Sequence, residues 1–156
     1  MRLEDVKKIG VLGTGIMGAG IAEVCARAGY SVVMRDISEE FVKKGFERIK
    51  ISLTKAVERG KITKEEFNAV LNRIKGVVDL AELRDADIII EAVPENMELK
   101  KKLLKELDEL CPQNTIFASN TSSLMITEMA SATKRPDRFV EPVRSCHACL
   151  LFCAGK

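Results

Sequence analysis

The chain has 156 residues, of which 46% are hydrophobic and 31% are charged. This length suits one average domain, and this composition excludes a disordered or collagen-like chain. Lys and Arg number 25 against 23 Asp and Glu, so the net charge is only +2, and we expect no nucleic-acid partner. The apolar stretches are too short to cross a bilayer and no secretory signal is visible, so we expect a cytoplasmic protein without membrane contact.

The first half of the chain alternates predicted strands and helices. Apolar runs and helical spacing predict, in chain order, a strand at 6–12, a helix at 16–29, a strand at 31–35, a long helix from Ser38 to Gly60, a helix at 63–74 and a minor strand at 77–78. The segment Thr63–Glu66 resembles a capping box, which predicts that the helix at 63–74 begins there.

The second half continues the alternation. Its predicted elements are a helical turn at 80–84, a strand at 87–93, a helix at 97–110, a strand at 115–118, a short helix at 123–131 and a strand at 138–140. The uninterrupted β-branched run at 88–90 is typical of a central parallel strand covered on both faces. The pattern therefore predicts an α/β fold of the Rossmann type, a doubly wound and mainly parallel sheet with helices on both faces.

A glycine-rich loop links the first strand to the first helix. Its residues are Gly13, Thr14, Gly15, Ile16, Met17 and Gly18, which fit the pattern G-x-G-x-x-G. In this pattern the first glycine allows a tight turn, the second lets a pyrophosphate approach the backbone, and the third lets the helix pack on the strand. The helix N-terminus adds free N–H groups and a partial positive charge.

Asp36 ends the next predicted strand, where its carboxylate can accept both ribose hydroxyls of an adenosine. The same carboxylate would repel a 2′-phosphate, so the sequence favours NAD over NADP. The competing interpretation is a structural strand-turn-helix that holds no nucleotide.

Three segments carry a resemblance to a known family. The glycine loop, I-I-I-E-A-V-P-E-N at 88–96 and A-S-N-T-S-S-L at 118–124 resemble the NAD-binding domain of 3-hydroxyacyl-CoA dehydrogenases, above all the bacterial and archaeal 3-hydroxybutyryl-CoA dehydrogenase branch. The segment A-T-K-R-P-D-R-F at 132–139 extends the resemblance, which runs from Val6 to Val140. It implies an enzyme that oxidises the 3-hydroxyl of an acyl-CoA to a 3-keto group and passes the hydride to NAD.

The resemblance implies roles at the carboxyl ends of two strands. Ala92 and Glu95 would line the nicotinamide-side ribose, with Lys100 nearby. Ser122 would contact cofactor and substrate and act in catalysis, by hydrogen-bonding the substrate 3-oxygen. Without a ligand, Ser122 is a helix cap, Glu95 a favourable first-turn acid and Lys100 a solvated helix charge.

The resemblance also implies a coenzyme A contact in the long helix. Ser52 and Arg59 fall where family members contact this part of the substrate, and Arg59 keeps a cation for a phosphate. The alternative for Arg59 is a solvated helix charge.

The resemblance breaks off after Val140. Relatives continue with G-M-H-F-F-N-P, whose histidine is the catalytic base, whereas this chain has Val143 in that register. We therefore expect an NAD-binding domain at 1–140, a divergent Cys-rich tail at 141–156, and no helical C-terminal dimerisation domain. Such a chain is expected to turn over poorly by itself. The alternative is a non-catalytic fragment or a subunit completed by a separately encoded C-terminal domain, and an uncovered apolar face would favour a homo-oligomer.

The five cysteines fall into two groups. Cys25 and Cys111 have apolar neighbours and are predicted to be small buried hydrophobes. The remaining thiols lie beside the single histidine in the tail: Cys146, His147, Cys149 and Cys153. Ligands crowded into so short a stretch make a cramped zinc or redox site, so we predict no metal and interpret the tail as the product of an altered reading frame or truncated gene.

Overall fold

The computed structural model describes residues 5–119 and 123–140 of the chain. Six parallel strands form its sheet, in the order β3-β2-β1-β4-β5-β6. The strands are β1 (Lys8–Leu12), β2 (Ser31–Arg35), β3 (Ile74–Val77), β4 (Ile88–Glu91), β5 (Ile116–Ser119) and β6 (Phe139–Val140). Parallel pairing places all carboxyl ends at one edge of the sheet, which is where such folds bind ligands.

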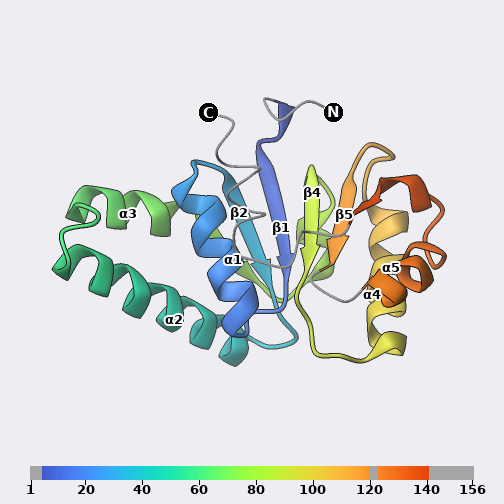
Figure 1. Ribbon diagram of the computed structural model, residues 1–156, viewed down its shortest axis with the longest axis horizontal. Coiled ribbons are helices and arrows are strands. Elements are labelled where there is room, and N and C mark those ends of the chain that lie inside the picture. Colours follow the sequence, from blue (N-terminus) through green and yellow to red (C-terminus); the bar gives the residue numbers. More distant parts are fainter. Residues whose placement is uncertain (1–4, 120–122, 141–156) are drawn as a thin grey trace.

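Helices cover both faces of this sheet (Figure 1). One face carries α1 (Ile16–Arg27), α2 (Glu39–Glu58) and α3 (Lys64–Asn72), and the other carries α4 (Met97–Leu110) and α5 (Ser123–Ala130). Short 3-10 turns occupy Leu80–Leu83 and Pro136–Arg138. The Rossmann-type prediction is confirmed. Among the helices described, none has both the length and the hydropathy that crossing a bilayer requires.

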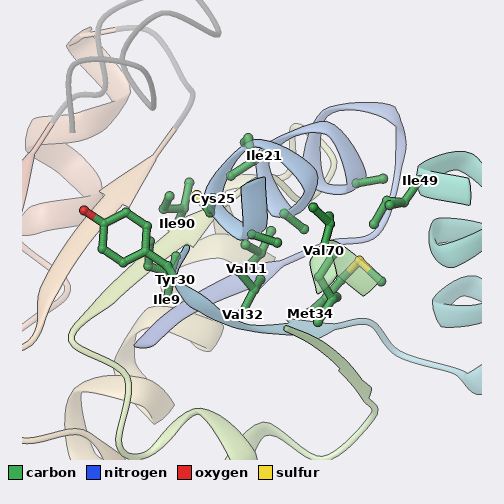
Figure 2. Packing of buried hydrophobic residues seen from close by; sticks show 14 of the residues in the cluster. Ile9, Val11, Ile21, Cys25, Tyr30, Val32, Met34, Ile49, Val70 and Ile90 are labelled. Atoms are coloured by element: carbon green, nitrogen blue, oxygen red, sulfur yellow. The ribbon is translucent and has the colours of Figure 1, made fainter. Parts of the chain in front are cut away.

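The core is divided between the two faces by the alternation of strand side chains. In β4, Ile88 and Ile90 join the cluster under α1, whereas Ile89 joins the cluster under α4. Figure 2 shows the first cluster, in which strand residues such as Val11 and Val32 pack beneath α1. The β-branched run therefore lies in a central strand buried on both sides, as its composition predicts.

The boundary between α3 and β3 differs from the sequence prediction. The capping box forms as expected, because Thr63 N–H donates to Glu66 and Glu66 N–H donates to the Thr63 hydroxyl. The helix, however, ends at Asn72, and the strand begins at Ile74 rather than Val77. Pairing with β2 sets this boundary. Val32 N–H donates to the Arg73 carbonyl at 2.8 Å, and this ladder holds the chain extended. Both predicted buried thiols, on Cys25 and Cys111, are buried.

Arg135 closes the C-terminal end of α4 from inside the protein. Its Nε donates to Asp108 Oδ1 at 2.6 Å, and its Nη2 donates to the Asp108 carbonyl at 2.6 Å and to the Cys111 carbonyl at 3.2 Å. Its Nη1 donates to the Pro112 carbonyl. The guanidinium carbon also lies 5.5 Å from the centre of the Phe117 ring. One buried cation thus satisfies carbonyl groups that the helix end leaves without intrahelical partners.

We expect Arg135→Ala to lower the free energy of unfolding by about 3–5 kcal/mol, because it leaves the Asp108 carboxylate buried without its cation. Urea denaturation measures this change. The matched control is Arg138→Ala, since the Arg138 side chain is 39% exposed and its Nε lies as far as 3.9 Å from Asp137 Oδ2. This substitution is expected to lower the free energy of unfolding by less than about 1 kcal/mol. Equal midpoints for the two variants would contradict the assigned role of Arg135.

Candidate functional site

The candidate site lies where the direction of strand order reverses. The chain runs from β1 outward through β2 and β3, and then returns to β4 on the other side of β1. Leu12 and Glu91 lie opposite each other at the ends of β1 and β4, and Ala92 N–H donates to the Leu12 carbonyl at 2.8 Å. The loops that follow these two strands diverge from this point. Open parallel sheets bind ligands in the crevice between such loops.

The three glycines of the loop meet different surroundings. Gly13 has a φ of 93°, and a Cβ there would lie 2.6 Å from the Ala92 carbonyl oxygen. A Cβ at Gly18 would lie 1.9 Å from the Gly13 carbonyl oxygen. The chain itself therefore requires these two glycines. A Cβ at Gly15, in contrast, would meet no atom within 4 Å, although the pattern predicts glycine there for close approach of a ligand.

The N-terminus of α1 fits an anionic group beside Gly15. Gly15 is the N-cap residue and provides no side-chain hydrogen bond, and the first turn holds no acidic residue. The partial positive charge and free N–H groups of this helix end are therefore available to a pyrophosphate. The residues present fit a dinucleotide, because the open space lies where a phosphate would reach the backbone.

Asp36 is held in place by the glycine loop. Thr14 N–H donates to Asp36 Oδ2 at 2.8 Å, and Ile37 N–H donates to Asp36 Oδ1 at 2.8 Å. The Thr14 hydroxyl lies 2.8 Å from both Asp36 Oδ2 and the Phe41 carbonyl, and can donate its proton to either. Thr14 is buried while Asp36 is half-buried, so the carboxylate is oriented by the chain before any ribose arrives. The sequence pattern does not reveal this link.

Apolar side chains are exposed around the loop. Ile16 and Met17, in the first turn of α1, are 80% and 48% exposed. Ile37 and Phe41, which follow β2, are 66% and 45% exposed. Exposed large apolar side chains often mark a binding surface. Here they offer faces against which flat rings can pack.

A buried ion pair lies below the second loop, at the ends of β4 and β5. Lys100 Nζ lies 3.4 Å from Glu91 Oε2 and 3.3 Å from Glu95 Oε2. The side chains of Lys100 and Glu91 are 2% and 1% exposed, whereas that of Glu95 is 64% exposed. Ala92 lies next to Gly13 at the start of this loop. The structure thus brings the predicted residues Ala92, Glu95 and Lys100 together, and shows that Lys100 is not a solvated helix charge.

A cleft of about 420 Å³ opens between α1 and α2. Ser52 lies on its α2 side together with Arg48 and Lys55, and Ile16 joins the cleft to the glycine loop. Arg59 is exposed at the C-cap of α2 and is not among the residues that line the cleft. A cation is favourable at a helix C-terminus, so Arg59 also has a role that needs no ligand.

Ser122 and residues 141–156, which include Val143 and His147, lie outside the described residues, and their predicted roles stay predictions. Within 5–119 and 123–140, no three His, Cys, Asp or Glu side chains are grouped to hold a metal ion.

The sheet order, the open glycine turn and the carboxylate at the end of β2 define a dinucleotide-binding domain of the Rossmann type. The family model of the 3-hydroxyacyl-CoA dehydrogenase NAD-binding domain matches residues 8–142. The chain belongs to this family, and its dinucleotide is NAD.

Individual relatives agree with this assignment. The probable 3-hydroxybutyryl-CoA dehydrogenase of Bacillus subtilis is 47% identical over 136 residues, which are 87% of this chain and 47% of the relative. The 3-hydroxyadipyl-CoA dehydrogenase of Escherichia coli is 42% identical, over 86% of this chain and 28% of the relative. Among solved structures, (S)-3-hydroxybutyryl-CoA dehydrogenase from Ralstonia eutropha has a TM-score of 0.84 and 43% identity, over 87% of this chain and 48% of that one. The chain spans about half the length of these relatives or less.

We expect Gly15→Ala to fold like the original chain but to bind NADH at least about tenfold more weakly, because its methyl group occupies the space that the pyrophosphate needs. The control is Gly20→Ala in the same helix, where a Cβ also meets no atom within 4 Å. That variant is expected to keep NADH affinity and to gain up to about 1 kcal/mol of helix stability. Fluorescence titration with NADH and urea denaturation test both. Unchanged NADH affinity in Gly15→Ala would remove the loop from the site.

Asp36→Asn keeps an oxygen that can accept from Thr14 N–H and removes the charge. We expect the ratio of NADH to NADPH affinity to fall by about tenfold or more, because the 2′-phosphate is no longer repelled and the ribose hydroxyls lose a charged acceptor. Parallel titrations with both nucleotides measure this ratio. Asp137→Asn, at a side chain that is 80% exposed beside Arg138, is the control and should leave it unchanged.

Proposed function

We propose that this chain supplies the NAD-binding half of an enzyme that oxidises the 3-hydroxyl of a 3-hydroxyacyl-CoA, of the 3-hydroxybutyryl-CoA type, to a 3-keto group. The observation that carries the proposal is that the glycine turn and the cleft between α1 and α2 meet at Ile16. Ile16 directly follows Gly15 of the glycine turn and also lines the cleft between α1 and α2. Cofactor and acyl-CoA can therefore meet at the carboxyl edge of the sheet. The names of the matched relatives support this substrate class.

The reaction removes two hydrogens from C3 and its oxygen. The chemistry that the bound cofactor supplies is acceptance of the C3 hydride, while the hydroxyl proton leaves to a base and the C3–O bond becomes a carbonyl. Ser122 is proposed to hold the substrate oxygen throughout. Val143 stands in the register of the family's histidine base, and loss of a general base typically lowers a rate by about 10²–10⁴-fold. We therefore expect NAD binding with slow turnover, or none, from the chain alone.

The cleft supports binding of the coenzyme A part of the substrate. Its lining combines apolar side chains such as Ile16 with the Ser52 hydroxyl, the cations Arg48 and Lys55, and one carboxylate, that of Glu23. This mixture fits a thioester arm that ends in phosphates. Arg59 lies further along α2 and would reach only an extended end of the substrate.

A second candidate is a non-catalytic NAD-binding fragment. The observation that favours it is the length of the relatives, of which this chain spans 47% in the Bacillus subtilis protein.

The test is oxidation of NADH with acetoacetyl-CoA, followed by loss of nicotinamide absorbance. The purified chain is assayed alone, and then with the C-terminal half of the Bacillus subtilis relative added as a separate polypeptide. We expect turnover to rise on addition and to be abolished by Ser122→Ala. Turnover without the addition would mean that another group replaces the missing base. If the chain binds NADH yet neither assay shows turnover, the catalytic proposal is wrong and the non-catalytic fragment stands.

A further inference from the structure

Glu91 is a buried carboxylate whose described contacts connect the loop between β4 and α4 with α4 itself and with β5. Its Oε1 accepts from Val93 N–H at 2.7 Å, and its Oε2 accepts from the Ser119 hydroxyl at 2.5 Å. The same Oε2 lies 3.4 Å from Lys100 Nζ. One side chain therefore contacts the first residues of the loop, the first turn of α4 and the end of β5. Neither the glycine motif nor the predicted nicotinamide contacts include it.

Burial makes the charge of Glu91 consequential. The Glu91 side chain is 1% exposed, and a cation and two hydrogen-bond donors take the place of water around its carboxylate. Lys100, which is 2% exposed, depends in turn on Glu91, since its other carboxylate partner, Glu95, lies mainly in solvent. Removal of the charge on Glu91 would leave the Lys100 ammonium drawn toward Glu95 alone. The side chains of Lys100 and Glu95 would then shift.

The position of this network matches one half of the cofactor. Asp36 at the end of β2 marks the adenosine side, and the N-terminus of α1 marks the pyrophosphate. The remaining half of a dinucleotide must extend across β1 toward β4, where Glu95 and Lys100 lie. This step rests on the proposed function only in taking the ligand to be NAD.

We propose that Glu91 is a positioning residue for the nicotinamide half of NAD: it fixes Lys100 from below, so that the Glu95 carboxylate is held at the rim of the crevice to accept from the ribose hydroxyls. Glu91 itself is enclosed and acts through Lys100 and through Val93 N–H. Glu91 thus helps to set the ratio between the affinity of the chain for the complete dinucleotide and its affinity for the adenosine diphosphate half.

The experiment compares NADH with ADP, which fills the adenosine and pyrophosphate positions but lacks the nicotinamide nucleoside. We expect Glu91→Gln to weaken NADH binding at least about tenfold while ADP affinity changes less than about twofold, because only the nicotinamide half depends on the Lys100 network. The matched control is Glu82→Gln, since Glu82 also pairs with a lysine, Lys75, at 2.6 Å, but on the surface. It should change neither affinity.

A double variant separates positioning from support of the fold. Glu91→Gln with Lys100→Met removes both charges, so the denaturation midpoint lost in the single variant is expected to recover. NADH affinity is expected to stay low, because the fixed cation is gone. Recovery of NADH affinity together with the midpoint would show that the pair is merely structural and overturn the inference. Equal loss of NADH and ADP affinity in Glu91→Gln would do the same.

The unsubstituted chain decides which conclusion has failed. If it binds NADH and Glu91→Gln binds NADH equally well, the role of Glu91 is wrong and the cofactor site stands. If it binds NADH no more tightly than ADP, the nicotinamide half contributes nothing and the inference falls alone. If it binds neither, the cofactor site and the inference fall together.

Discussion

Direct backbone contact at the crossing of β1, α1 and β4 is the constraint on which the site depends. A side chain at Gly13 would press on the Ala92 carbonyl, and one at Gly18 would overlap the Gly13 carbonyl. Because both positions lack a Cβ, α1 begins directly at the end of β1 and its N-terminus points into the crevice. The position of Gly15 follows from this contact: it is the one glycine of the loop that faces open space, so packing does not require it, and close approach of a ligand is its predicted role.

The two buried ion pairs of the described chain have different consequences. Arg135 and Asp108 lie at the end of α4, and the guanidinium also donates to backbone carbonyls there. This pair therefore stabilises the end of the helix. Glu91 and Lys100 lie at the carboxyl edge of the sheet, and Lys100 also contacts the exposed Glu95. A buried charge pair is weak evidence for stability by itself. Its meaning comes from the contacts that each partner makes beyond the pair.

Sequence pattern predicts the elements whose burial is complete and fails where tertiary contacts decide. The β-branched run of β4 and the glycine loop were predictable, because burial on both faces and close backbone approach each demand particular residue types. The start of β3 was not, since only Ile74 of this strand is buried and pairing with β2 fixes its bounds. Glu91 was also missed. At the end of a strand a glutamate is ordinary, and only the distances to Lys100 and Ser119 reveal its role.

The carboxylates at the ends of β2 and β4 have the same structural role on opposite sides of β1: each accepts a hydrogen bond from the backbone of a loop. Asp36 accepts from Thr14 N–H and thereby braces the glycine loop, while Glu91 accepts from Val93 N–H and braces the loop before α4. Each loop is thus tied to a strand end by a charged acceptor, which is stronger than a neutral one. Because Asp36 is half-buried, its carboxylate can also meet a ribose, whereas the enclosed Glu91 must act through Lys100. In the proposed site, the side chains that fix the geometry of the loops are therefore also those that recognise the cofactor. A substitution that changes one will change the other unless it preserves the acceptor for the backbone N–H.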